Sequence, residues 1–95
     1  MLLLSRFKIA GHSMSPTFSE DDSVLVSSLP LLFFKPKIGD VVVFEKYNRF
    51  YIKRIDKIEN EKYFLVGDNK NDSFDSRRFG SVKRSQIKGK VILKI

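Results

Sequence analysis

Short apolar runs separated by polar turn residues set the strongest limit on how this chain can fold. No stretch keeps the periodicity of an α-helix for more than one or two turns, whereas several runs are β-branched or aromatic. These runs predict strands at residues 7–10, 23–27, 41–44, 50–58, 63–66 and 87–95, with a short strand or bend at 79–82. The expected fold class is mainly β, a single compact domain of coiled antiparallel sheets.

The run Val-Val-Val-Phe at residues 41–44 has no polar alternation and predicts a strand that is buried on both faces. Turn residues lie on either side of the long run that follows it. Residues 46–49 and 60–61 are therefore predicted to close two hairpins. Residues 67–78 are polar and predict a loop.

The chain has 95 residues, which is enough for one domain covering residues 1–95 and leaves no room for a second module. Hydrophobic residues make up 42% of it, including nine Phe, and this suffices for one core. With no cysteine and a single histidine, neither a disulfide framework nor a transition-metal site is expected. The spaced aspartates at 68, 72 and 75 lack the terminal bidentate Glu of a calcium loop, and no metal or cofactor is expected.

The net charge of +7 is concentrated near one end of the chain, because residues 70–94 hold eight Lys or Arg and two Asp. Such a basic face is either simply solvated or binds an anionic partner, meaning nucleic acid or an anionic membrane surface. Nucleic acid is the less favoured partner, because no recognised binding motif is present.

Residues 29–34 form the most apolar segment, bounded by prolines and followed by lysines. They are either a buried connection or a loop that contacts a membrane interface. The membrane contact would use Leu29, Leu31, Leu32, Phe33 and Phe34. No apolar run approaches the ~18–20 residues that span a bilayer, and the opening residues 1–4 are too short for a signal-peptide core. We therefore expect a soluble or peripheral membrane protein.

Ser13 lies in a turn between two predicted strands and is the best candidate for a nucleophile. A serine hydroxyl needs a neighbouring base, and His12 is badly placed because adjacent side chains on extended backbone point to opposite sides. Lys53 is the better base, since Ser-Lys pairs are a known variant of the serine constellation. It lies in the apolar sequence Phe-Tyr-Ile-Lys-Arg-Ile, where burial would lower its pKa.

Three blocks in order carry a family resemblance. They are Gly-His-Ser-Met-Ser-Pro-Thr at residues 11–17, Tyr-Ile-Lys-Arg-Ile at 51–55, and Gly-Asp-Asn followed by Ser-Phe-Asp-Ser-Arg within 67–77. The chain resembles the type I signal peptidases and their relatives, which are serine proteases with a Ser-Lys dyad. The third block is the most specific, and the set covers nearly the whole chain. The resemblance implies the coiled antiparallel sheets of the signal peptidase core.

The resemblance also implies roles for individual residues. Ser13 would be the nucleophile and Lys53 the general base that takes its proton. Ser73 corresponds to the serine that orients the lysine amine by a hydrogen bond. Asp75 and Arg77 correspond to a structural ion pair beside the site.

The remaining matched residues would shape the site: Gly11, Met14, Pro16, Gly67, Asp68 and Asn69. The turn beginning at Gly67 would bring Ser73 under Lys53. Gly11 stands where some relatives have a serine that donates to the oxyanion, so the backbone N–H of Ser13 is the expected donor. Met14 would line the site or pack beneath it.

The resemblance implies a serine endopeptidase that removes a leader or signal segment from a precursor polypeptide through an acyl-enzyme. Small maturation proteases, such as those that process nickel superoxide dismutase, fit the short length as well as general signal peptidases do. A non-catalytic β domain that binds an anionic partner through its basic face is the alternative from another class. A self-cleaving repressor-type protease is a third possibility, weakened because no DNA-binding half or cleavable arm is present.

Overall fold

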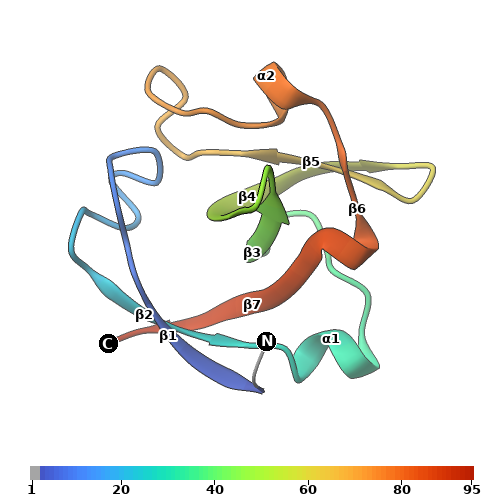
Figure 1. The fold of residues 1–95 in the computed structure, drawn as a ribbon, viewed down its shortest axis with the longest axis horizontal. Coiled ribbons are helices and arrows are strands. Elements are labelled where there is room, and N and C mark those ends of the chain that lie inside the picture. Colours follow the sequence, from blue (N-terminus) through green and yellow to red (C-terminus); the bar gives the residue numbers. More distant parts are fainter. Residues whose placement is uncertain (1–2) are drawn as a thin grey trace.

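The computed structural model describes residues 3–95, which form one seven-stranded antiparallel sheet with two single-turn helices (Figure 1). The strand order is β1-β2-β7-β3-β4-β5-β6. The elements follow the chain as β1 (Leu4–Lys8), β2 (Ser23–Ser27), α1 (Pro30–Phe33), β3 (Val41–Lys46), β4 (Arg49–Glu59), β5 (Lys62–Val66), α2 (Ser76–Phe79), β6 (Val82–Lys83), a 3₁₀ turn (Arg84–Gln86) and β7 (Ile87–Lys94). The expected mainly β class is confirmed.

Two tight hairpins organise the centre of the sheet. Between β3 and β4 the residues Tyr47 and Asn48 have φ of 54° and 59°, and between β4 and β5 Asn60 and Glu61 have φ of 51° and 62°. Positive φ at both central residues is the geometry of a two-residue turn whose twist matches its strands. Both predicted hairpin turns are therefore present.

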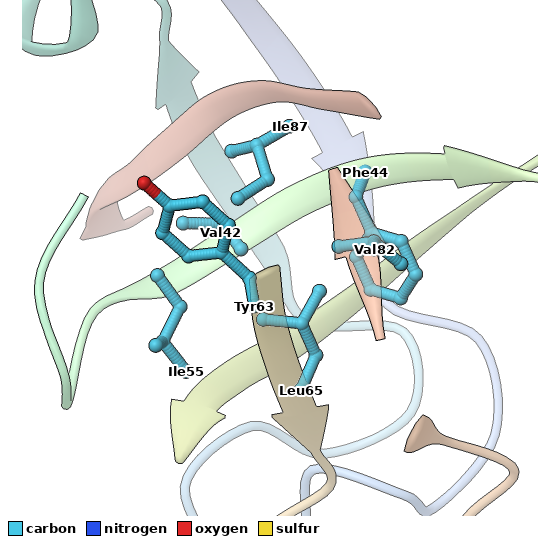
Figure 2. Close-up of a cluster of buried hydrophobic side chains, with 7 residues drawn as sticks. All are labelled: Val42, Phe44, Ile55, Tyr63, Leu65, Val82 and Ile87. Carbon is cyan, nitrogen blue, oxygen red and sulfur yellow. The ribbon is translucent and has the colours of Figure 1, made fainter. Parts of the chain in front are cut away.

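The sheet coils so that it encloses two clusters of buried side chains. One cluster unites β3, β4, β5, β6 and β7 and consists of Val42, Phe44, Ile55, Tyr63, Leu65, Val82 and Ile87 (Figure 2). The other lies between β1, β2 and β3 and consists of Ile9, Val24, Val26 and Val43. Because β3 supplies alternate side chains to both clusters, its predicted burial on two faces is confirmed.

The structure corrects the prediction for the first strand, which lies at Leu4–Lys8 rather than at residues 7–10. Its pairing with β2 runs from Leu4 opposite Ser27 to Lys8 opposite Ser23, so β1 ends where its partner begins. Ile9 lies beyond that ladder, where its N–H donates to the carbonyl of Asp22 (2.8 Å). The polar loop at 67–78 ends in α2, and β6 begins at Val82 rather than at residue 79.

The interpretation of residues 29–34 as a buried connection is wrong. Residues 30–33 form the single turn α1, which buries one side only: Leu31 packs against the larger core cluster. Arg84 holds this turn by donating from Nη2 to the carbonyl of Leu31 (3.1 Å). The other four apolar side chains are 47–74% exposed: Leu29, Leu32, Phe33 and Phe34. No helix within residues 3–95 is long and apolar enough to cross a membrane.

Candidate active site

Ser13 and Lys53 come together although 40 residues separate them in sequence. Lys53 lies in β4 opposite Val42 of the central strand β3, and its side chain is only 5% exposed. Its Nζ donates to Ser13 Oγ at 2.8 Å and to the carbonyl of Ile52 at 3.2 Å. The amine therefore points at the serine hydroxyl from within the sheet.

The surroundings of Lys53 favour its neutral form. Burial lowers the pKa of the Lys53 amine, and the carboxylate of Asp75 opposes this effect only in part. The ring of Tyr51 covers one side of the amine, with its centre 5.8 Å from Nζ. A lysine with a lowered pKa is more often neutral, and a neutral amine can accept a proton from a neighbouring hydroxyl.

Replacing Lys53 with methionine is expected to stabilise the domain at neutral pH, because a buried amine that must be desolvated is exchanged for an apolar side chain. The parent's free energy of unfolding should rise with pH between the lowered folded pKa and the ~10.4 of an unfolded lysine, since the unfolded state binds more protons there. The variant lacks this rise, so the gap between the two proteins should close at strongly alkaline pH.

Thermal melts of both proteins at neutral and strongly alkaline pH measure this effect. Lys57→Met is the matched control, because Lys57 lies on the same strand but is exposed and paired with Glu59. If Lys53→Met were less stable than the parent at neutral pH, the desolvated amine would be ruled out.

The turn after β5 holds the backbone on either side of the serine. The N–H of Asn69 donates to the carbonyl of Ser13 (2.8 Å), and its side-chain amide donates to the carbonyl of His12 (3.2 Å). A Cβ at Gly67 would collide with the side chain of Ser73 and with the carbonyl of Ser13. Glycine is therefore required at this position because the serine turn, Ser73 and the strand end approach so closely.

A second network, which the sequence reasoning missed, joins Arg54 to the same turn. Its guanidinium makes a bidentate pair with Asp68 (2.8 and 2.9 Å) and donates to the carbonyl of Gly39 (2.8 Å). Thr17 donates from its hydroxyl to the same carboxylate. The serine turn, β4 and the turn at Asp68 are thereby tied together. Alternation along β4 predicts only that Arg54 lies on the face opposite Lys53, and no local pattern selects Asp68 as its partner.

Asp75 is fully buried and accepts four hydrogen bonds. Its donors are the N–H of Gly67 (2.9 Å), the N–H of Arg77 (3.1 Å) and two guanidinium nitrogens of Arg77 (3.0 and 2.9 Å). Burial works to raise the pKa of this carboxyl, but the bonds from Arg77 and Gly67 outweigh it and hold the pKa well below its usual range. The expected ion pair between Asp75 and Arg77 is present.

Ser73 is half-buried, with its Oγ enclosed; within residues 3–95 this oxygen has no hydrogen-bond partner by distance and angle, although it is near enough to Asp75 to help lower the pKa of that carboxyl. Ser73 lies against Gly67, directly beside the serine turn. The structure shows no bond from it to Lys53, so its role in orienting the lysine stays a prediction. A buried hydroxyl without a hydrogen bond lowers the stability of the fold. A small rotation of the Ser73 side chain would let its hydroxyl form one.

The remaining residues of the serine block differ in what they do. Met14 is 2% exposed and lines the groove described below, whereas Gly11 adopts φ of 78° in open space, which explains a glycine there. Pro16 follows in the same turn. His12 is exposed and lies 3.8 Å from Glu20, so its imidazole turns away from the reacting pair.

A groove of about 270 Å³ opens beside the Ser13–Lys53 pair. It runs between β1 and the first half of β4 and is lined by Phe7, Lys8, Ile9, Ala10, Ser13, Met14, Arg49, Phe50, Tyr51, Ile52 and Lys53. Within the described chain, no three side chains of His, Asp or Glu gather to hold a metal ion.

A coiled antiparallel sheet that presents a serine hydroxyl to a buried lysine amine in a groove defines a peptidase-like protein. The sequence matches the family described as "Signal peptidase, peptidase S26" over residues 1–58 and 52–95. The chain belongs to this family, and the resemblance drawn from the three sequence blocks is confirmed.

Individual relatives are distant. The chain is 23% identical to the "Signal peptidase I" of Leptolyngbya laminosa, with 90% of this chain aligned to 66% of that protein. It is 25% identical to the "Signal peptidase I V" of Bacillus subtilis strain 168, with 87% of this chain and 80% of that protein aligned. It is also 22% identical to the "Inactive signal peptidase IA" of Staphylococcus aureus strain N315, with 99% and 83% aligned. These alignments are 133–144 positions long, so the relatives carry insertions within the matched region.

Proposed function

We propose that the domain formed by residues 1–95 is a serine endopeptidase that removes a leader or signal segment from a precursor polypeptide. The observation that carries this proposal is the 2.8 Å separation of Ser13 Oγ and Lys53 Nζ, made by an amine that is almost fully buried. Membership of the signal peptidase family supports a peptidase-like function and a polypeptide substrate.

In the proposed reaction Ser13 Oγ attacks the scissile carbonyl while its proton passes to the neutral amine of Lys53. The tetrahedral intermediate collapses, and the lysine returns that proton to the leaving amine. Water then attacks the acyl-enzyme with Lys53 again as base, and the free carboxylate and serine hydroxyl are restored. The first proton transfer crosses the hydrogen bond already present between the two side chains, and the later ones run between Lys53 Nζ and the leaving amine or the attacking water.

The oxyanion requires a donor close to Ser13. Within residues 3–95 the backbone N–H of Ser13 donates no hydrogen bond, while its carbonyl is held by Asn69. A free N–H on a fixed backbone is suited to a developing negative charge. Gly11 has no side-chain hydroxyl to assist, so this N–H is the proposed donor.

The direct test is covalent trapping. The protein is incubated with an electrophilic serine acylator such as a β-lactam, digested, and the adduct is located by mass spectrometry. Label on Ser13, and on none of the other serines, is the expected result. A protein that stays unlabelled at Ser13 would favour the alternative of a non-catalytic domain that binds an anionic partner.

We further propose a peripheral membrane contact through α1 and its flanks. Leu29, Leu32, Phe33 and Phe34 are exposed, and the next lysines, at 35 and 37, suit an anionic lipid surface. Leu31 faces the core and contributes little. In Figure 1 this segment lies at the opposite side of the molecule from the loop that follows β1 and carries Ser13. Membrane contact through α1 would thus leave the loop that carries Ser13 uncovered.

The double variant F33S/F34S is expected to lose sedimentation with anionic vesicles while it keeps the parent's melting temperature. Salt should weaken parental binding, because attraction of lysines to the surface is screened. The control is I92S/L93S, which removes two half-exposed apolar residues from β7. Unfolding of F33S/F34S, or unchanged binding, would contradict the contact.

A further inference from the structure

The groove beside Ser13 and Lys53 changes character along its length. Side chains on a strand alternate, so Arg49, Tyr51 and Lys53 lie on the same face of β4. Arg49 precedes Lys53 by four residues, which places it roughly 13 Å along the strand at ~3.3 Å per residue. The intervening lining is largely apolar and includes Phe7 and Phe50, whose rings meet edge to face at 6.2 Å.

Two cations line the groove and both are exposed: Arg49, at the end remote from Lys53, and Lys8. No Asp or Glu is among the lining residues, and within residues 3–95 neither cation forms a salt bridge.

The neighbouring hairpin increases this positive charge. Arg49 lies directly opposite Lys46 in the β3–β4 register. The amine of Lys46 lies over the rings of Tyr47 (5.4 Å) and Phe79 (5.3 Å), so Arg49 is the cation of this pair that is left for an anion. The local arrangement therefore favours a negatively charged ligand group at this end of the groove.

We propose that the groove selects precursor segments carrying an Asp or Glu about four residues from the scissile bond, with Arg49 as the main contact and Lys8 as the second. This inference rests on the proposed peptidase function and names its substrate class. An acidic peptide fits better than a small free anion, because the apolar stretch between the reacting pair and Arg49 matches the side chains of an extended segment.

The experiment begins from a fluorescence-quenched peptide that the protein cleaves, selected from a mixed library. Glu, Gln and Lys are placed in turn at two to six residues from the cleaved bond, on each side. At one position three to five residues away, on one side only, kcat/KM should be roughly tenfold higher for Glu than for Lys. The difference should lie mainly in KM and should shrink as salt is raised.

Arg49→Glu should reverse the preference at that position, so that the Lys peptide is cleaved better than the Glu peptide. Lys62→Glu is the matched control: it makes the same change in net charge from an exposed site on β5, outside the groove, and should leave the preference intact. Arg49→Gln and Lys8→Gln serve as milder variants, each expected to reduce the preference for Glu.

The possible results distinguish failure of the acidic substrate preference from failure of the proposed peptidase function. Cleavage with equal rates for Glu, Gln and Lys at every position would overturn the acidic preference and leave the peptidase proposal standing. A reversal in the Lys62→Glu control would show a general charge effect and would also overturn it. If no library peptide is cleaved and Ser13 is not acylated, both proposals fail together.

Discussion

Lys53→Ala will slow acylation of Ser13 by the trapping reagent by a factor on the order of 10⁴ or more, and Ser13→Ala will abolish it. In the proposed mechanism the serine depends on the amine to take its proton, and no other base is within hydrogen-bond distance of its hydroxyl among residues 3–95. The measurement is the rate of adduct formation followed by intact-protein mass spectrometry. Peptide cleavage, once a substrate is known, provides a second readout.

The two side chains should act as one unit, so the double variant S13A/K53A will cleave no more slowly than the worse single variant. Lys57→Met should acylate at the parental rate, which separates loss of the base from loss of a positive charge on β4. All variants are expected to keep the parental fold. Near-normal acylation of Lys53→Ala would eliminate the lysine as the base, whatever the serine does.

Asp75→Ala is expected to cost about 1–3 kcal/mol of stability, mainly because the buried N–H of Gly67 loses its acceptor. The substitution leaves the guanidinium of Arg77 and the N–H of Gly67 without their acceptor, and it opens space in a fully buried position. Urea unfolding measures the loss. Asp72→Ala, an exposed residue of the same loop, should be nearly neutral.

The same carboxylate gives the stability a defined dependence on acid. Its folded pKa is lowered, so its contribution is complete above the ~3.9 of an unfolded aspartate and declines as pH falls from there towards the folded value. Asp75→Asn should be less stable than the parent at neutral pH, with a gap that narrows under acid conditions. A gap that stays constant from neutral to strongly acidic pH would show that ionisation of Asp75 contributes nothing.

Local chemistry explains which parts of the fold could be read from the sequence. The hairpins at Tyr47-Asn48 and Asn60-Glu61 depend on neighbouring residues, and so does the two-sided burial of β3. The exposure of Phe33 and Phe34 was not predictable. An apolar run looks the same whether it is packed or solvated, and here a single helical turn leaves one residue to face the core.

The sequence predicted the individual residues of the site better than it predicted the hydrogen bonds and ion pairs between them. Ordered sequence blocks singled out Ser13 and Lys53, and the structure brings the two side chains together. The pairing of Arg54 with Asp68 could not be derived, because the chain offers 18 cations and 11 carboxylates and no local rule selects one pair. The unbonded state of Ser73 likewise depends on rotations within a packed turn.

The position of β7 links synthesis of the chain to the assembly of its reactive pair. In the sheet, β1 and β2 carry the serine turn, β3 and β4 carry the lysine, and β7 is the strand that pairs with both β2 and β3. Val24 pairs with Lys94, which lies 70 residues later in the sequence. Because strand pairing over so long a separation is slow, we expect the ladder that joins the two halves to form late. We therefore expect the contact between Ser13 and Lys53 to form only after Ile87–Lys94 has paired with both β2 and β3.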